Sequence, residues 1–78
     1  MTLTLADIKQ DKTYLINKIN TDDNILRERF VALGICVGTS VRLLERSIDR
    51  ATIAIMTNNT RIALRVSEAR EVSIREIA

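Results

Sequence analysis

The sequence predicts a mainly β fold, a small antiparallel barrel of about five strands with one helix inserted after the first strand. The second half of the chain alternates apolar and polar side chains with a period of two, which is typical of half-buried strands. Short turns separate these stretches. Several short strands joined by tight turns within 78 residues favour a closed sheet, because closure protects strand edges from further pairing.

The amino-terminal part is expected to contain a short turn and the first strand. Scattered apolar residues over positions 3–8 surround a short turn near residues 6–9. Residues 14–19 (YLINKI) then predict the first strand, because apolar and β-branched side chains dominate this run.

One helix is expected over residues 23–33. The Asp and Asn side chains that precede it are preferred at helix starts, where their oxygens accept hydrogen bonds from free backbone amides. Leu26, Phe30 and Leu33 fall at i, i+4 and i+7 and therefore share one face. Gly34 follows in the position where a left-handed residue ends a helix.

Four further strands are expected after the helix. The alternating stretches are residues 39–45, 52–56, 61–66 and 71–77. They are joined by turns at residues 47–51 and 57–60 and by a short turn at 67–69, where one helical turn would fit. Asn58 and Asn59 suit a tight hairpin, because Asn tolerates left-handed conformations.

Composition predicts one cytoplasmic domain that spans residues 1–78. The chain has 46% hydrophobic and 28% charged residues, which is ordinary for a globular fold. A single cysteine gives no internal disulfide, and neither a signal peptide nor a run of 18 apolar residues is found. The 12 basic and 10 acidic residues are mixed along the chain, so we expect no nucleic-acid partner.

The residue types exclude the usual catalytic and metal sites, so we expect neither an enzyme nor a cofactor. Histidine is absent, and histidine is the commonest general acid or base. Cys36 has apolar neighbours and is interpreted as a small structural residue rather than a reactive thiol. Asp22 and Asp23 could offer oxygens to a hard cation, but we interpret them as helix-capping residues.

A face rich in arginine leaves a second interpretation open, an RNA-binding small barrel. Arg42, Arg61, Arg65 and Arg75 all fall at outward positions of the expected strands. Single-strand binders also need aromatic side chains for stacking, and the chain has one Tyr and one Phe. We therefore favour a solvated face with ion pairs between strands.

A few apolar side chains predict a protein-docking surface. Val31 lies off the apolar stripe of the helix, and Leu44 and Met56 point away from the inward faces of their strands. Single exposed apolar residues are normal, so these would form a docking site only as one patch. Phe30 is open to either interpretation, core or surface. The expected partner-binding residues are Phe30, Val31, Gly34, Leu44 and Met56.

Residues 27–41 (RERFVALGICVGTSV) resemble the FeoA family, the small cytoplasmic accessory proteins of bacterial ferrous iron uptake. The most specific feature is Leu33-Gly34 followed by Gly38-Thr39 and a valine strand. The opening LADIK and the late IALR segment match the family in the right order. The turns depart from the family pattern: Val37 replaces a usual proline, and Gln10-Asp11, residues 47–51 and Asn58-Asn59 replace usual proline or glycine turns.

This resemblance implies an SH3-like barrel with an inserted helix. It also implies an adaptor that binds and modulates FeoB, the membrane ferrous iron permease, through the permease's cytoplasmic region. Contact with the membrane would then be indirect, through the permease, and a homo-oligomer is a further possibility because small barrels can pair through exposed strand edges. The alternative is a small-barrel RNA- or protein-binding module outside iron transport.

Overall fold

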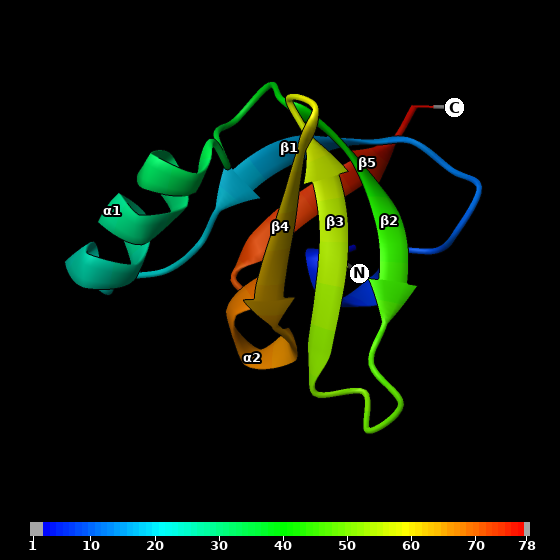
Figure 1. The fold of residues 1–78 in the computed structure, drawn as a ribbon. Helices are drawn as coiled ribbons and strands as arrows, with labels where there is room; N and C mark the ends of the chain where they lie inside the picture. Colours follow the sequence, from blue (N-terminus) through cyan, green and yellow to red (C-terminus); the bar gives the residue numbers. More distant parts are fainter. Residues whose placement is uncertain (1–2, 78) are drawn as a thin grey trace.

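The computed structural model describes residues 3–77 and contains five strands, one long helix and two short helical turns (Figure 1). The elements are the 3-10 turn η1 (Leu5–Asp7), β1 (Tyr14–Ile19), α1 (Asn24–Leu33), β2 (Ser40–Arg46), β3 (Thr52–Thr57), β4 (Thr60–Arg65), α2 (Val66–Ala69) and β5 (Val72–Glu76).

The five strands form one antiparallel sheet in the order β4-β3-β2-β1-β5. The register shifts between Ile16 and Lys18 in β1 and between Leu43 and Glu45 in β2. Such bulges bend a strand and increase its twist, which lets a small sheet curl toward a barrel. The curled sheet confirms the predicted mainly β fold with a helix after the first strand.

The interior of the curled sheet holds the core. Every strand contributes inward side chains, and η1 and α2 add more from between the sheet ends. Tyr14 is buried, and its hydroxyl accepts a hydrogen bond from the Lys9 amide at 3.1 Å. The fully buried core residues include Leu5, Ile8, Tyr14, Ile16, Phe30, Ile35, Val41, Ile53, Ile55, Leu64 and Val72.

Helix α1 carries the predicted capping residues at both of its ends. The Asp23 side chain accepts hydrogen bonds from the amides of Ile25 (2.9 Å) and Leu26 (3.3 Å), which satisfies two free donors of the first turn. Gly34 ends the helix with a φ of +84°. Phe30 is buried in the core, with Leu26 and Leu33 packed beside it.

The helix stands beside the barrel and does not lie flat across it (Figure 1). Its inward stripe holds it to the core, and Arg27 donates a hydrogen bond to the Thr21 carbonyl at 2.6 Å. Most of the remaining surface of α1 is exposed, including Ile25 and Val31.

A tight hairpin joins β3 to β4. Asn58 and Asn59 have φ values of +53° and +60°, so both central residues of this two-residue turn are left-handed. This is the type I′ geometry whose twist matches that of the flanking strands. The predicted turn is confirmed, and its residues fix the register of β4 against β3.

Candidate partner-binding surface

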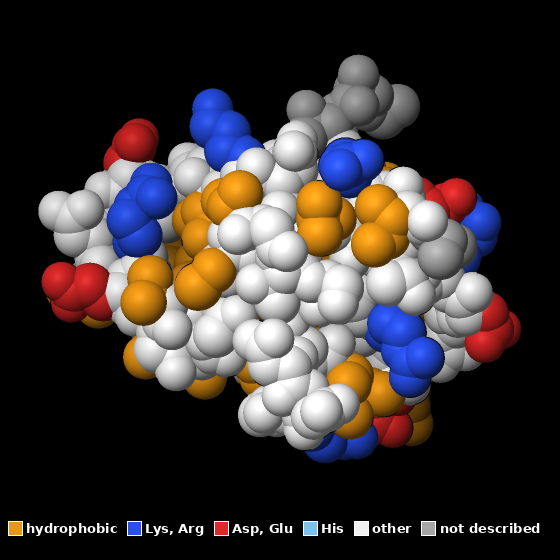
Figure 2. Space-filling model, turned by 90° about the horizontal axis from the view of Figure 1, so that it is seen from above, with side chains coloured by type: hydrophobic (Ala, Val, Ile, Leu, Met, Phe, Trp, Pro, Cys, Tyr) orange, Lys and Arg blue, Asp and Glu red, His pale blue; other side chains and the backbone are white. Residues whose placement is uncertain are grey.

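A shallow groove lies between the carboxyl end of α1 and strand β4. Its volume is about 490 Å³, within the range of ligand sites. It exposes more apolar than polar surface, and Figure 2 shows apolar side chains gathered on the side of the molecule that carries α1, with basic side chains beside them. The lining residues are Arg29, Val31, Ala32, Leu33, Gly34, Asn58, Thr60, Arg61, Ile62 and Ala63.

Contacts between the helix and the β4 region bound the groove at its two ends. At one end the Asn58 amide donates a hydrogen bond to the Gly34 carbonyl at 3.5 Å. At the other end Arg29 of α1 forms an ion pair with Glu68 of α2, and the Glu68 side chain is mostly buried. Both walls of the groove are therefore held in place by the fold.

The main chain of β4 forms one wall. Residues 60–63 all line the groove, although the Ile62 side chain is 4% exposed and points into the core. Four consecutive strand residues alternate in side-chain direction, so all of them can line one groove only when their backbone faces it. The groove therefore exposes a strand edge as well as side chains.

The outer face of the sheet continues from this edge. Ala63 of β4 pairs with Ala54 of β3, and Arg61 pairs with Met56. Arg61 also forms an ion pair with Glu45 of β2 at 2.7 Å, and this pair crosses the outer face of β3 because β2 and β4 flank that strand. The ion pair between strands that the sequence predicts is thus present for Arg61.

The groove unites two of the predicted partner-binding residues. Val31, with 60% of its surface exposed, and Gly34 both line it. Leu44 and Met56 are half-buried and lie outside it: Leu44 is the extra residue of the β2 bulge, and Met56 lies on the outer face of β3 beside Arg61. The patch of Val31, Leu44 and Met56 that the sequence leaves open is therefore divided between two surfaces.

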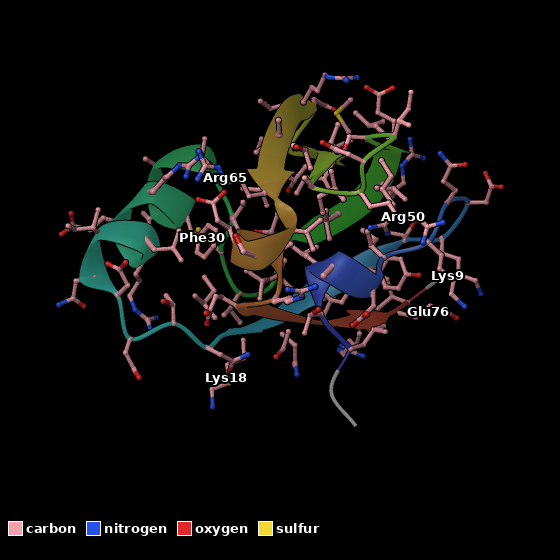
Figure 3. All side chains as sticks on the ribbon, turned by 90° about the horizontal axis from the view of Figure 1, so that it is seen from below. Lys9, Lys18, Phe30, Arg50, Arg65 and Glu76 are labelled. Carbon is pink, nitrogen blue, oxygen red and sulfur yellow. The ribbon has the colours of Figure 1, made fainter. Side chains whose placement is uncertain are left out.

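Phe30 requires a correction. It is 0% exposed, and Figure 3 shows it on the side of α1 that faces the barrel. A side chain that holds the helix to the core cannot also contact a partner, so Phe30 is excluded from the surface. Sequence reasoning missed most of the lining, including Leu33, Asn58 and Ala63, because no pattern along the chain shows that α1 and β4 lie face to face.

Basic side chains surround the groove. Arg29 and Arg61 line it, and Figure 3 shows Arg65 extending from the end of β4 toward α1. Glu68 pairs with Arg29 and lies beyond the lining residues. The lining itself contains no acidic side chain, and both of its arginines pair with carboxylates that lie outside it, so the groove is apolar with a polar border.

The arginines of the predicted basic face are divided between the two ends of the strand order. Arg42 and Arg61 both pair with Met56 on the outer sheet face, but Arg75 lies on β5, at the other end of the strand order. Both aromatic residues, Tyr14 and Phe30, are buried. Bases therefore have no exposed aromatic ring on which to stack.

Within residues 3–77, no three His, Cys, Asp or Glu side chains are grouped closely enough to hold a metal ion. Asp23 caps α1 as predicted. Cys36, interpreted from the sequence as a small structural residue, is exposed and does not pack in the core, because the loop after Gly34 turns it outward while Ile35 enters the core. None of the helices in this described part of the chain is long and apolar enough to cross a membrane.

Comparison with known proteins agrees with this architecture. The FeoA domain model matches residues 3–76. A Helicobacter pylori protein (strain J99) named Fe(2+) transport protein A is 40% identical over 76 residues, which cover 97% of each chain.

Solved structures show the same fold. Zinc-complexed FeoA from Stenotrophomonas maltophilia, described as a prokaryotic SH3 domain protein, superposes with a TM-score of 0.79 at 23% identity over 92% of this chain and 88% of that one. A manganese-dependent transcriptional repressor superposes with a TM-score of 0.89 at 17% identity, over 97% of this chain and 41% of the repressor. The fold is thus SH3-like, and the chain belongs to the FeoA domain family.

Proposed function

We propose that this protein is a cytoplasmic accessory protein of ferrous iron transport, which binds the cytoplasmic region of the membrane permease FeoB and modulates it without being an enzyme. Its membership of the FeoA family and its 40% identity to a relative named Fe(2+) transport protein A support the transport role. The absence of histidine from the sequence supports a binding role over a catalytic one.

The groove between α1 and β4 is the single observation on which the docking proposal rests. It combines an exposed apolar wall, formed by Val31 and Ala32, with a border of arginines. Protein interfaces are typically built this way, with an apolar centre and a polar rim.

The proposal is tested by capture of the cytoplasmic domain of the cognate permease on immobilised protein, at physiological salt, with and without guanine nucleotide. Val31→Glu places a charge in the apolar wall of the groove and should weaken binding by about tenfold or more, because burying a charge against an apolar contact is costly. Its unfolding midpoint should stay near that of the original protein, since Val31 is largely exposed.

Ile48→Glu is the matched control. Ile48 is fully exposed in the loop between β2 and β3, at the end of the barrel opposite the β3–β4 hairpin (Figure 1). The same substitution there should leave capture unchanged. Undiminished capture by folded Val31→Glu protein would remove the groove from the docking surface, and no capture by the original protein would contradict the proposal.

A further inference from the structure

The two edge strands of the sheet are covered differently. The free edge of β5 is partly paired, because Ser73 forms a bridge with Thr4 and the Ile74 amide donates to the Leu3 carbonyl at 2.8 Å. The free edge of β4 faces α1 across the groove, and no strand among residues 3–77 lies beyond it (Figures 1 and 3). An open strand edge offers a row of backbone donors and acceptors for pairing.

The pairing at the β3–β4 hairpin determines which backbone groups of β4 point away from β3 and are available for pairing. Thr57 and Thr60 flank a two-residue turn and form a hydrogen-bonded pair, and such pairs alternate along an antiparallel ladder. The amides and carbonyls of Arg61, Ala63 and Arg65 therefore point away from β3, into the groove. The Arg65 amide already donates to the Glu68 carboxylate at 3.0 Å, so Arg61 and Ala63 form the open part of the edge.

The opposite wall determines the side chains that an added strand would need. Side chains on its inner face would lie between β4 and the Ala32 and Leu33 side of α1, where the lining is apolar. Side chains on its outer face would lie level with Arg61 and Arg65, beside the small Ala63. An added strand that fits this groove would therefore carry apolar side chains at its inward positions and acidic side chains at its outward positions.

The same arginines disfavour pairing with a second copy of the chain. An antiparallel β4–β4 contact centred on Ala63 would place Arg61 of each copy opposite Arg65 of the other. Directly opposed like charges destabilise a strand pair. The charge of the edge therefore favours an acidic partner strand over a second copy.

We propose that the open edge of β4 binds a short extended segment of a partner protein by strand addition, and that this segment alternates apolar and acidic residues. The Arg61 and Ala63 backbones supply the hydrogen bonds, α1 supplies the apolar contact, and the Arg65 side chain selects acidic side chains. Since the two ends of the groove are bounded by Asn58 and by the Arg29–Glu68 pair, the paired stretch is short. This inference names the chemistry of the partner segment and rests on the proposed docking function.

A peptide of about six residues that alternates Val and Glu, with blocked ends, is the direct probe. Titration into isotopically labelled protein should shift the Arg61 and Ala63 amide signals saturably. The same peptide N-methylated on the amides that face β4 should bind at least about tenfold more weakly, because it has lost its strand donors. Equal binding of both peptides, or no binding of the first, would overturn strand addition.

Ala63→Pro tests the edge from the protein side. Proline removes the outward amide of residue 63 but leaves the pairing with β3, and edge strands tolerate it there. Ala63→Thr is the matched control, since it retains the amide. The expected result is an affinity reduced about tenfold for Ala63→Pro and changed by less than about threefold for Ala63→Thr. Should Ala63→Pro fail to fold, the N-methylated peptide gives the same test on the unchanged protein.

Reversing the charge of Arg65 tests whether this residue selects acidic side chains in the partner segment. Arg65→Glu should weaken the binding of the Val/Glu peptide and strengthen the binding of a Val/Lys peptide of the same length. A retained preference for the acidic peptide would contradict the role of Arg65.

The permease capture experiment separates this inference from the proposed function. Capture that is equally strong with Ala63→Pro and the original protein would leave the transport role intact and overturn strand addition.

Discussion

Gly34 performs two roles at one position. Its φ of +84° ends α1, and a Cβ atom there would lie 3.2 Å from the Asn58 amide nitrogen across the groove. Gly38 has a similar φ of +92° but has nothing within 4 Å of a built Cβ. Both glycines therefore adopt a left-handed backbone conformation, but only Gly34 has a neighbouring side chain that an added Cβ would contact.

We expect Gly34→Ala and Gly38→Ala each to lower the free energy of unfolding by about 1–2 kcal/mol, because an L-residue is strained in the left-handed region. Urea unfolding measures this cost. Only Gly34→Ala should also shift the side-chain amide signals of Asn58 in an NMR spectrum, since only that Cβ reaches the groove. An Asn58 signal that moves equally in both variants would contradict the contact.

The ionisation of the Asp49 side chain depends on hydrogen bonds within its own loop. Its carboxylate accepts hydrogen bonds from the Ser47 hydroxyl at 2.6 Å and from the Ala51 amide at 3.0 Å, which together hold the loop between β2 and β3. These bonds, the Ser47 one above all, lower the pKa of Asp49 below its ordinary value of 3.8.

Because the folded pKa is the lower one, the stabilisation by Asp49 is present above pH 3.8 and is lost as the pH falls through the folded value. An NMR titration of the Asp49 carboxyl should give a pKa below 3.8 in the folded protein. Ser47→Ala should move it back toward the ordinary value, and Ile48→Ala should leave it in place. A pKa that does not respond to Ser47→Ala would show that the hydroxyl is not its cause.

At the scale of elements, α1 depends on a narrow apolar stripe. Phe30 is its one fully buried side chain, while Leu26 and Leu33 are partly buried. The helix projects beside the barrel, so few other contacts can replace Phe30 (Figure 1).

Phe30→Ala should therefore lower the free energy of unfolding by about 3–5 kcal/mol, through lost burial and a cavity. Val31→Ala, one position along on the exposed side, should change it by less than about 0.5 kcal/mol. Chemical denaturation of both variants measures the difference. Equal costs at the two positions would mean that α1 is not anchored by Phe30.

The strands and helix could be predicted because each has a local cause. Period-two alternation identified β2 to β5 to within a residue or two, and the cap at Asp23 with Gly34 bounded α1. The groove could not be predicted in the same way. Val31 and Ala63 are far apart in the chain, and only the curl of the sheet places β4 beside α1.

At the scale of the whole molecule, charge and aromatic content argue against nucleic acid. The formal net charge is +2, and the Lys12–Glu76 and Arg61–Glu45 pairs spread both signs over the surface. The two aromatic residues are both in the core.

We therefore expect no saturable binding of single-stranded RNA at physiological salt, measured by fluorescence anisotropy with a labelled oligouridine. Any association at low salt should fall steeply as salt is added, because it would come from phosphate contacts alone. Saturable, salt-resistant binding would contradict this expectation and favour the RNA-binding alternative.

The sequence by itself determined what depends on neighbours along the chain: the strand periodicity, the helix and its caps, and the Asn-Asn hairpin. Only the tertiary structure decided what depends on distant contacts. It placed Phe30 in the core, turned Cys36 outward, and opened a groove between α1 and the free edge of β4. The reason is physical: periodicity and capping act over a few residues, whereas burial and edge exposure are set by how the curled sheet positions segments that are remote in sequence.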